Sequence, residues 1–137
     1  MSSDKPLKIS IAMAIYNGGK YLQEQLDSFL AQTRFPDELV VTDDCSSNNT
    51  LEIIQAFAAV APFDVRWEQN EKTLGYTGNF NQAVMKTAGD LVFLSDQDDV
   101  WFPEKIAILE QYMLADPNVL VVMKMQRLQM ASSMIRG

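Results

Sequence analysis

Short apolar runs alternate with segments of helical periodicity along the first 123 residues of the chain. Short apolar runs bounded by turn residues predict buried strands, and apolar residues spaced three and four apart predict amphipathic helices. The predicted strands are 8–17, 38–44, 63–70, 90–95 and 119–123, and the predicted helices are 20–33, 51–61, 80–89 and 103–114. This alternation predicts an α/β domain with a mainly parallel sheet and helices on both faces. The third strand alternates apolar and polar residues, which favours a place near a sheet edge.

Glycine and proline divide the second half of this pattern. The segment 71–79 is predicted as a loop, in which Gly75 and Gly78 either let a ligand approach closely or only shape a turn. Gly89 is expected to close the third helix at its C-terminus. Pro103 suits the first position of the fourth helix, where a missing N–H group costs nothing.

The composition excludes several classes of function. With 137 residues, 47% of them hydrophobic and 21% charged, the chain can form one soluble domain with a core. Its formal charge of −7 argues against nucleic-acid binding, which needs clustered Lys and Arg. The absence of histidine excludes histidine-based zinc sites and Ser-His-Asp triads, and the single cysteine excludes an internal disulfide.

Nothing in the sequence indicates insertion into a membrane. No apolar run reaches the length of a membrane helix, and the N-terminus lacks the apolar stretch of a secretory signal. We therefore expect a protein without a transmembrane segment that is cytoplasmic, either free or at the inner face of the membrane.

The composition changes after residue 123. The segment 124–137 carries three basic residues and no acidic one, whereas residues 1–123 carry eight basic and eighteen acidic residues. We therefore divide the chain into a domain, residues 1–123, and a tail, residues 124–137. The tail is a short terminal helix, a linker into further sequence or an altered C-terminus.

Polar residues follow three predicted strands at the point where each strand ends. Tyr16 and Asn17 end the first strand, Asp43 and Asp44 end the second, and the segment 96–99 follows the fourth. Parallel strands place their carboxyl ends at one edge of a sheet, and ligands bind at that edge. We therefore expect these residues to converge.

The segment after the fourth strand contains Asp96, Asp98 and Asp99. Carboxylates in the spacing Asp-x-Asp suit Mg²⁺ or Mn²⁺, whose other ligands are often waters and substrate phosphates. Carboxylates crowded on one turn repel each other unless a cation neutralises them. In the alternative interpretation, Asp99 caps the following helix, while Asp96 and Asp98 face solvent. The spacing alone does not decide between the two.

The other strand-end residues also allow two interpretations. Asp43 and Asp44 either make turns and helix caps or accept a hydrogen bond from a nucleobase N–H group. Tyr16 either stacks on a base or fills the rim of the core. No glycine-rich phosphate loop is present, so a metal would have to meet the charge of a phosphate ligand. The lysines that could assist it, or simply lie on the surface, are Lys72, Lys86 and Lys105.

Four motifs occur in a characteristic order: ISIAMAIYNGG, ELVVTDDCSSN, NEKTLGYTGNFNQA and DLVFLSDQDDVWFPEK. Over residues 9–122 the chain resembles the nucleotide-binding half of a family 2 glycosyltransferase with the Rossmann-like GT-A fold. The resemblance implies a divalent metal, manganese or magnesium, on Asp96 and Asp98. It also implies that Asp43 or Asp44 contacts a uracil or thymine ring. The implied nucleotide-binding residues are Ala14, Tyr16, Asn17, Asp43, Asp44, Asn70, Gly75, Asn81 and Asp96.

The resemblance further implies an inverting, metal-dependent sugar transfer. The donor would be a nucleoside-diphosphate sugar, and the acceptor a saccharide or a lipid-linked saccharide in cell-surface polysaccharide synthesis. The stretch FLSDQDDVWFPEK is similar to that of bacterial rhamnosyltransferases, which points to a deoxythymidine- or uridine-diphosphate sugar.

Two departures from the family pattern accompany the resemblance. Ala14 and Ile15 stand where the family often has Pro-Thr, and contacts there are partly made by the backbone. The family's catalytic domain continues well past the fifth strand, so we expect a truncated fold without the acceptor pocket and the general base. Apolar surface left uncovered by such truncation would favour a homo-oligomer.

Two other functions remain open from the sequence. The first is a phospho-accepting receiver-type signalling domain, for which Lys124 after the fifth strand is the only match. The second is a nucleotide-binding remnant that keeps the fold without catalytic activity.

Overall fold

The computed structural model describes residues 7–47, 49–95 and 100–115. Within them the strands are all parallel and form one sheet in the order β3-β2-β1-β4. The strands are β1 (Ile9–Ile15), β2 (Glu38–Asp43), β3 (Asp64–Gln69) and β4 (Leu91–Ser95). The helices are α1 (Gly19–Leu30), α2 (Thr50–Val60), α3 (Gly75–Met85) and α4 (Lys105–Ala115).

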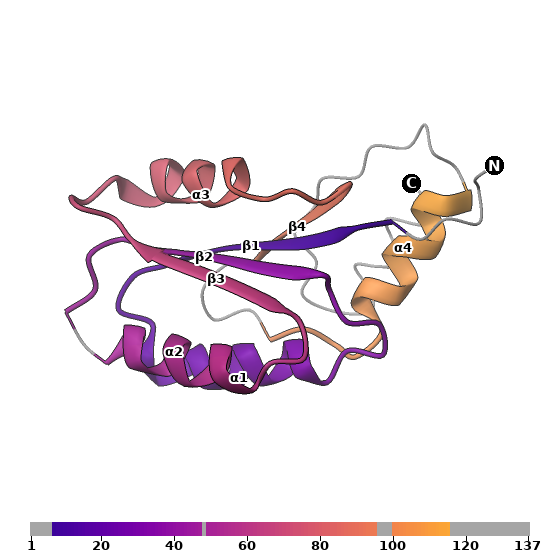
Figure 1. The fold of residues 1–137 in the computed structure, drawn as a ribbon, viewed down its shortest axis with the longest axis horizontal. Coiled ribbons are helices and arrows are strands. Elements are labelled where there is room, and N and C mark those ends of the chain that lie inside the picture. The colour runs from indigo at the N-terminus through magenta and orange to yellow at the C-terminus, as the bar shows by residue number, and fades with distance from the viewer. Residues whose placement is uncertain (1–6, 48, 96–99, 116–137) are drawn as a thin grey trace.

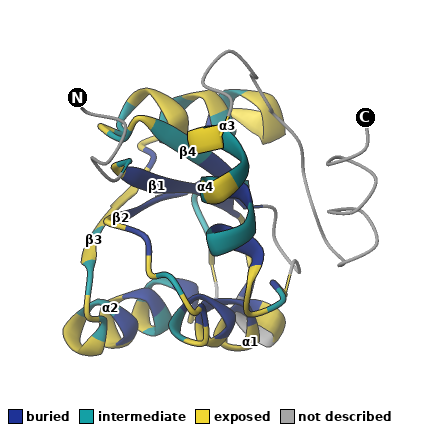
Figure 2. Ribbon diagram, turned by 90° about the vertical axis from the view of Figure 1, so that its right-hand side faces the viewer, coloured by how far each residue is buried: buried dark blue, intermediate teal, exposed yellow. Residues whose placement is uncertain are grey.

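Helices cover both faces of the sheet, as the alternating pattern predicts. Helices α1 and α2 lie side by side on one face, and α3 lies on the other (Figure 1). Seen end-on, the buried strands β1 and β2 lie between these two helical layers (Figure 2). Strand β3 is largely exposed and pairs only with β2 among the described strands, which confirms its predicted edge position.

The two faces of β1 differ in the size of their side chains. Ile9, Ile11, Met13 and Ile15 belong to the main hydrophobic cluster, which also contains Leu22, Leu26, Phe29, Ile54 and Phe57 from α1 and α2. Successive side chains of a strand point to opposite faces. The face toward α3 therefore carries the small residues Ser10, Ala12 and Ala14. Their small size lets α3 lie close to the sheet.

A buried carboxylate fastens the segment after α3 to the sheet. Glu38, at the start of β2, accepts hydrogen bonds from Ser10 Oγ (2.5 Å), from the backbone N–H of Ala88 (2.6 Å) and from Arg66. Burial raises the pKa of the Glu38 carboxyl, but these hydrogen bonds and the Arg66 charge outweigh it, so the net pKa lies below the ordinary value. The carboxylate therefore remains ionised and ties β1, β2 and the approach to β4 together.

Helix α3 differs from the prediction in both its ends and its buried face. The helix runs from Gly75 to Met85, whereas the sequence predicts 80–89. Its buried residues are Asn79 and Ala83, while Val84, which the pattern assigns to the core, is 36% exposed. The pattern fails because the residue at the centre of the buried face is a polar asparagine.

The sequence suggests that Gly89 closes α3. In the structure α3 ends at Met85, and Gly89 lies against the start of β1 instead. A Cβ atom at Gly89 would lie 2.9 Å from Lys8 O and 2.9 Å from Ser10 N, and closer still to Ser10 Oγ. Glycine is therefore required at this position by close backbone approach rather than by a helix cap.

Helix α4 begins at Lys105, two residues after the predicted start at Pro103. Arg34 holds it to the rest of the domain by donating to both carboxylate oxygens of Glu110, at 3.1 and 2.9 Å. No described helix combines the length and the apolar character that crossing a bilayer requires. The predicted fifth strand 119–123 and the tail 124–137 lie outside the described residues, so the boundary at residue 123 stays a prediction.

We expect Gly89→Ala to lower the free energy of unfolding by about 1–3 kcal/mol, because the added methyl group overlaps backbone atoms. Urea denaturation measures the change. Gly78→Ala serves as the comparison, since its Cβ would meet only Leu74 Cβ, at 3.1 Å. A Gly89→Ala variant as stable as Gly78→Ala would contradict the close approach.

Candidate functional site

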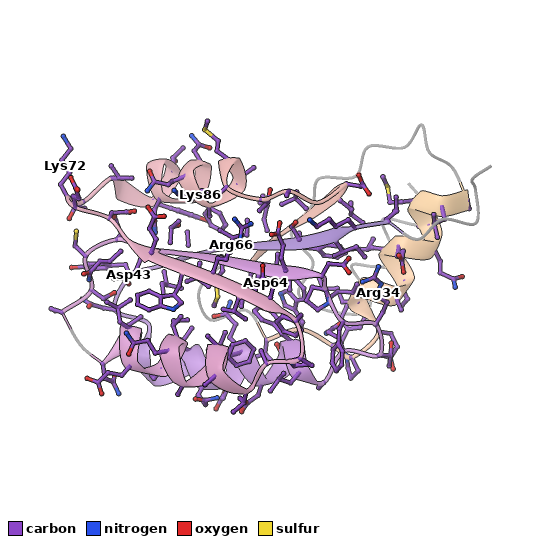
Figure 3. All side chains as sticks on the ribbon, viewed as in Figure 1. Arg34, Asp43, Asp64, Arg66, Lys72 and Lys86 are labelled. Carbon is purple, nitrogen blue, oxygen red and sulfur yellow. The ribbon has the colours of Figure 1, made fainter. Side chains whose placement is uncertain are left out.

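The ends of β1, β2 and β3 meet at one edge of the sheet. Ile15 pairs with Asp43, and Asp43 with Gln69. Beyond the strands, the Asp44 N–H donates to Ile15 O (2.9 Å), and the Asn70 N–H donates to Asp43 O (2.8 Å). The expected convergence of the first two strand ends is therefore present. Figure 3 shows Asp43 and Lys72 toward this same end of the molecule.

A pocket of about 340 Å³ lies between this edge and the N-terminal half of α3. The sheet contributes the ends of β1 and β2, and the helix contributes its first turns. The lining residues are Ala14, Ile15, Tyr16, Asp44, Thr73, Gly75, Tyr76, Asn79 and Phe80.

The carboxylate of Asp44 holds the beginning of α3 against the strand ends. Its Oδ1 accepts hydrogen bonds from Leu74 N (2.7 Å) and Asn70 Nδ2 (2.9 Å), and its Oδ2 accepts one from Gly75 N (3.0 Å). Leu74 is the N-cap of α3. Asp44 thus satisfies N–H groups that the helix itself leaves without acceptors, and the helix dipole favours its negative charge.

The environment of Asp44 also keeps it ionised. Burial raises the pKa of its carboxyl, but the hydrogen bonds from Leu74, Asn70 and Gly75 lower it by more, so the net pKa lies below the ordinary value. An ionised carboxylate has about four acceptor positions. Three donors occupy three of them, which leaves one acceptor position on Oδ2.

Asp43 occupies a different environment from its neighbour. It is fully buried, lies outside the pocket lining, and accepts hydrogen bonds from both N and Oγ of Ser46 and from Gln69 Nε2. Strand alternation explains the difference, since Asp43 shares the side of Leu39 and Val41, which pack toward α1 and α2. Of the two acids, Asp44 is the one that faces the pocket.

An amide network continues from Asp44 into α3. Asn70 donates from Nδ2 to Asp44 Oδ1 and to Asn79 Oδ1, both at 2.9 Å. Its Oδ1 accepts a hydrogen bond from Gln82 Nε2, also at 2.9 Å. Asn79 in turn donates to Ile15 O and Thr42 O. The network joins all three elements that border the pocket.

Asn17 connects the loops that follow β1 and β2. Its backbone lies in the left-handed region, with φ of 49°, which asparagine tolerates better than most residues. Its N–H donates to Ser46 Oγ, and its Oδ1 accepts from the Ser47 N–H, both at 2.8 Å. Asn17 therefore shapes the rim rather than the lining of the pocket.

Aromatic side chains form much of the pocket wall. Tyr16 is 53% exposed and Tyr76 is 61% exposed, and the Tyr76 ring packs on Phe80 with centroids 5.3 Å apart. Gly75 carries the chain into α3 with φ of +80°, a conformation that glycine adopts without strain. The wall therefore offers partly exposed aromatic surfaces beside the buried carboxylate of Asp44.

The predicted site residues thus fall into separate groups. Ala14, Tyr16, Asp44 and Gly75 line the pocket, whereas Asn17, Asp43 and Asn70 support it. Asn81 is exposed on α3 and does not line the pocket. Asp96, Asp98 and Asp99 lie outside the described residues. The lining residues that the sequence interpretation did not single out are Ile15, Thr73, Tyr76, Asn79 and Phe80.

The described residues do not themselves form a metal site. Within residues 7–47, 49–95 and 100–115, no three His, Cys, Asp or Glu side chains gather where they could hold a metal ion. Asp43 and Asp44 accept three protein hydrogen bonds each, so their oxygens are largely occupied.

The three candidate lysines have different environments. Lys86 forms an ion pair with Glu68 (3.0 Å). Lys105 is not a surface residue: it is 1% exposed, and its Nζ lies 4.0 Å from the centre of the Trp101 ring. Lys72 is exposed and lies at the same end of the molecule as Asp43 (Figure 3).

A parallel α/β sheet with a pocket beyond its carboxyl edge defines a class of ligand-binding domain that includes many nucleotide-binding proteins. Within that class, the model of the family "Glycosyl transferase family 2" matches residues 10–133. The chain therefore belongs to glycosyl transferase family 2, as the four motifs indicate, and this assignment replaces the receiver-type alternative.

Individual relatives agree with this assignment. An uncharacterized glycosyltransferase of Nostoc sp. is 34% identical over 113 residues, which are 80% of this chain and 34% of the relative. The dTDP-rhamnosyl transferase RfbG of Shigella flexneri is 32% identical over 98 residues, which are 69% of this chain and 34% of the relative.

Solved structures share the fold. TarS of S. aureus, residues 1–349 in complex with UDP-GlcNAc, superposes with a TM-score of 0.71 at 30% identity, over 77% of this chain and 31% of that chain. The fold is that of the GT-A glycosyltransferases. The chain spans about a third of the length of these three proteins.

We expect Asp44→Asn to lower the free energy of unfolding by about 1–3 kcal/mol at pH 7, because an amide cannot accept all three hydrogen bonds. A carboxyl whose pKa is lowered by folding stabilises the fold at any pH above its ordinary pKa of 3.8. This stabilisation is lost as the pH falls through the lower pKa of the folded state. The difference between wild type and variant should therefore shrink in acid.

Urea denaturation between pH 7 and pH ~3 measures this difference. Asp27→Asn on the exposed side of α1 is the matched control, with an expected change within about 0.5 kcal/mol. A constant difference between wild type and Asp44→Asn down to the acid limit would contradict an ionised Asp44.

Proposed function

We propose that this domain binds the donor of a glycosyltransferase, a nucleoside-diphosphate sugar, at the carboxyl edge of β1 and β2. The observation that carries the proposal is the pocket in which Asp44 is ionised, fixed by three donors, and left with one acceptor position beside aromatic surfaces. The family assignment and the UDP-GlcNAc complex of the similar TarS structure support it.

The chemistry of the pocket favours a base whose edge donates a hydrogen bond. A carboxylate that only accepts hydrogen bonds selects a ligand edge that donates one. Uracil and thymine present an N3–H group, whereas the N3 of cytosine is an acceptor. Tyr16 and Tyr76 offer aromatic faces for a base or ribose. Donors with a uridine or deoxythymidine diphosphate fit this arrangement, and the similar dTDP-rhamnosyl transferase RfbG and UDP-GlcNAc complex of TarS favour them among the donating bases.

The negative charge of the diphosphate requires a cation. The described residues that line the pocket include no lysine or arginine. Asp96 and Asp98 follow β4 directly in the sequence and carry the oxygen ligands that Mg²⁺ and Mn²⁺ prefer. We propose that these two residues hold the metal, with Asp96 also near the nucleotide. Such an ion would neutralise the negative charge that develops on the leaving diphosphate.

The complete reaction is proposed as an inverting transfer. A carboxylate outside the described residues would deprotonate the acceptor hydroxyl, which then displaces the nucleoside diphosphate from the sugar. The acceptor would be a saccharide or lipid-linked saccharide of cell-surface polysaccharide, with rhamnose one candidate sugar because of RfbG. Such a protein would work in the cytoplasm, free or at the inner membrane face.

Nucleotide titration with and without Mn²⁺ tests the donor site directly. We expect the wild-type chain to bind UDP or dTDP, and Mn²⁺ to strengthen binding by about 10-fold or more, equivalent to about 1.4 kcal/mol. Asp98→Ala should lose this gain and keep the metal-free affinity, because the base contacts remain.

Glu24→Ala, an exposed acid on α1, is the matched charge control and should keep the full Mn²⁺ effect. An equal Mn²⁺ gain in wild type and Asp98→Ala would remove Asp98 from its proposed role. No binding of either nucleotide by the wild-type chain would refute the proposed function.

A further inference from the structure

We propose that Asn79 is a positioning residue of the nucleotide pocket, which sets the choice of base by fixing Asn70 and, through it, the carboxylate of Asp44. This inference rests on the proposed function, since it takes Asp44 as the group that receives the base N–H. Asn79 lies at the floor of the pocket rather than at the rim, and it is 3% exposed.

Asn79 is hydrogen-bonded to the ends of both central strands. Its Nδ2 donates to Ile15 O (3.3 Å), after which β1 ends, and to Thr42 O (3.2 Å), near the end of β2. Its own backbone carbonyl accepts a hydrogen bond from Thr42 Oγ1 (3.0 Å). The side chain of Asn79 thus helps to fix helix α3 over β1 and β2.

The direction of the amide network is fixed from both of its ends. The backbone carbonyls of Ile15 and Thr42 can only accept, so the amide of Asn79 must turn its NH₂ group toward them. Its Oδ1 then faces Asn70 and accepts from Asn70 Nδ2 (2.9 Å). The second hydrogen on that nitrogen goes to Asp44 Oδ1, which as a carboxylate oxygen can also only accept.

This fixed direction determines which acceptor position of Asp44 remains for a ligand. Asn70 and Leu74 occupy Oδ1, and Gly75 takes one position on Oδ2. Without Asn79, the Asn70 amide keeps the hydrogen bond that its Oδ1 accepts from Gln82 Nε2, but its Nδ2 group loses the acceptor beside Asp44, which loosens its hold on Asp44. The carboxylate would then present two incompletely occupied oxygens, and its preference for one donor in one direction would weaken.

A purely structural role for Asn79 predicts a different result. Loosening of α3 would weaken the binding of every nucleotide to a similar extent. A positioning role predicts instead that the ratio of affinities changes between UDP, which donates from N3–H, and CDP, whose N3 accepts and whose donor is the 4-amino group. The ratio separates the two roles because both ligands share the ribose and the diphosphate.

The experiment measures dissociation constants for UDP and CDP, both with Mn²⁺, by isothermal titration calorimetry. The variants are Asn79→Leu, which keeps the size of the side chain, and Asn79→Ser, which decides the test if the leucine variant does not fold. The control is Ser10→Ala, which removes a buried hydrogen bond to Glu38 at the opposite end of β1.

We expect wild type to prefer UDP by about 10-fold or more, and the Asn79 variants to lose most of this preference. Their CDP affinity should stay within about 2-fold of wild type, and Ser10→Ala should lose stability but keep the preference. An unchanged ratio, or an equal loss for both nucleotides, would overturn the positioning role while UDP binding by wild type still supports the donor site. No UDP binding by wild type would overturn both.

Discussion

The architecture of the pocket depends on one buried interaction, between the carboxylate of Asp44 and the first N–H groups of α3. Thirty residues separate the partners in sequence, and the contact places the start of a helix at the edge where two strands end. At the other end of the same helix, Glu38 binds the backbone of Ala88. Two ionised, buried carboxylates therefore hold α3 and its connection to β4 on the sheet, one at each end.

Only the end at Asp44 has the properties of a binding site. Glu38 also accepts three hydrogen bonds, from Ser10, Arg66 and Ala88, but it lies outside the lining of the pocket. Asp44 borders a pocket and retains an acceptor position. Since parallel strands present their carboxyl ends on the same side, the sheet itself explains why binding is expected at this end.

Much of the fold could be predicted from the sequence, because strands buried on both faces produce continuous apolar runs. The predicted strands 38–44 and 90–95 differ from β2 and β4 by a single residue at one end. Helix α3 could not be placed in this way, since its cap comes from Asp44, far away in sequence, and its buried face is centred on an asparagine.

The sequence was also limited in predicting which single residues form the site. Asn79 and Asn81 lie two positions apart, which is roughly 200° around a helix, so only one of them can face the sheet. The family resemblance singled out Asn81, and Asn79 fell in the predicted loop 71–79, whereas the structure buries Asn79 in α3. Strand alternation alone could have shown which of Asp43 and Asp44 faces the pocket, because it places Asp44 on the side of α3. Nothing in the sequence indicated that Tyr76 lines the pocket, since it lay in a predicted loop.

The central claim is that a nucleotide occupies the pocket between Asp44 and the first turns of α3. The most direct measurement is the set of backbone amide shifts in a ¹⁵N-correlated NMR spectrum as UDP and Mg²⁺ are added. We predict the largest changes at Asp44, Gly75 and Tyr76, with little change along α4. Changes concentrated on α4 or at the amino ends of the strands would contradict the account.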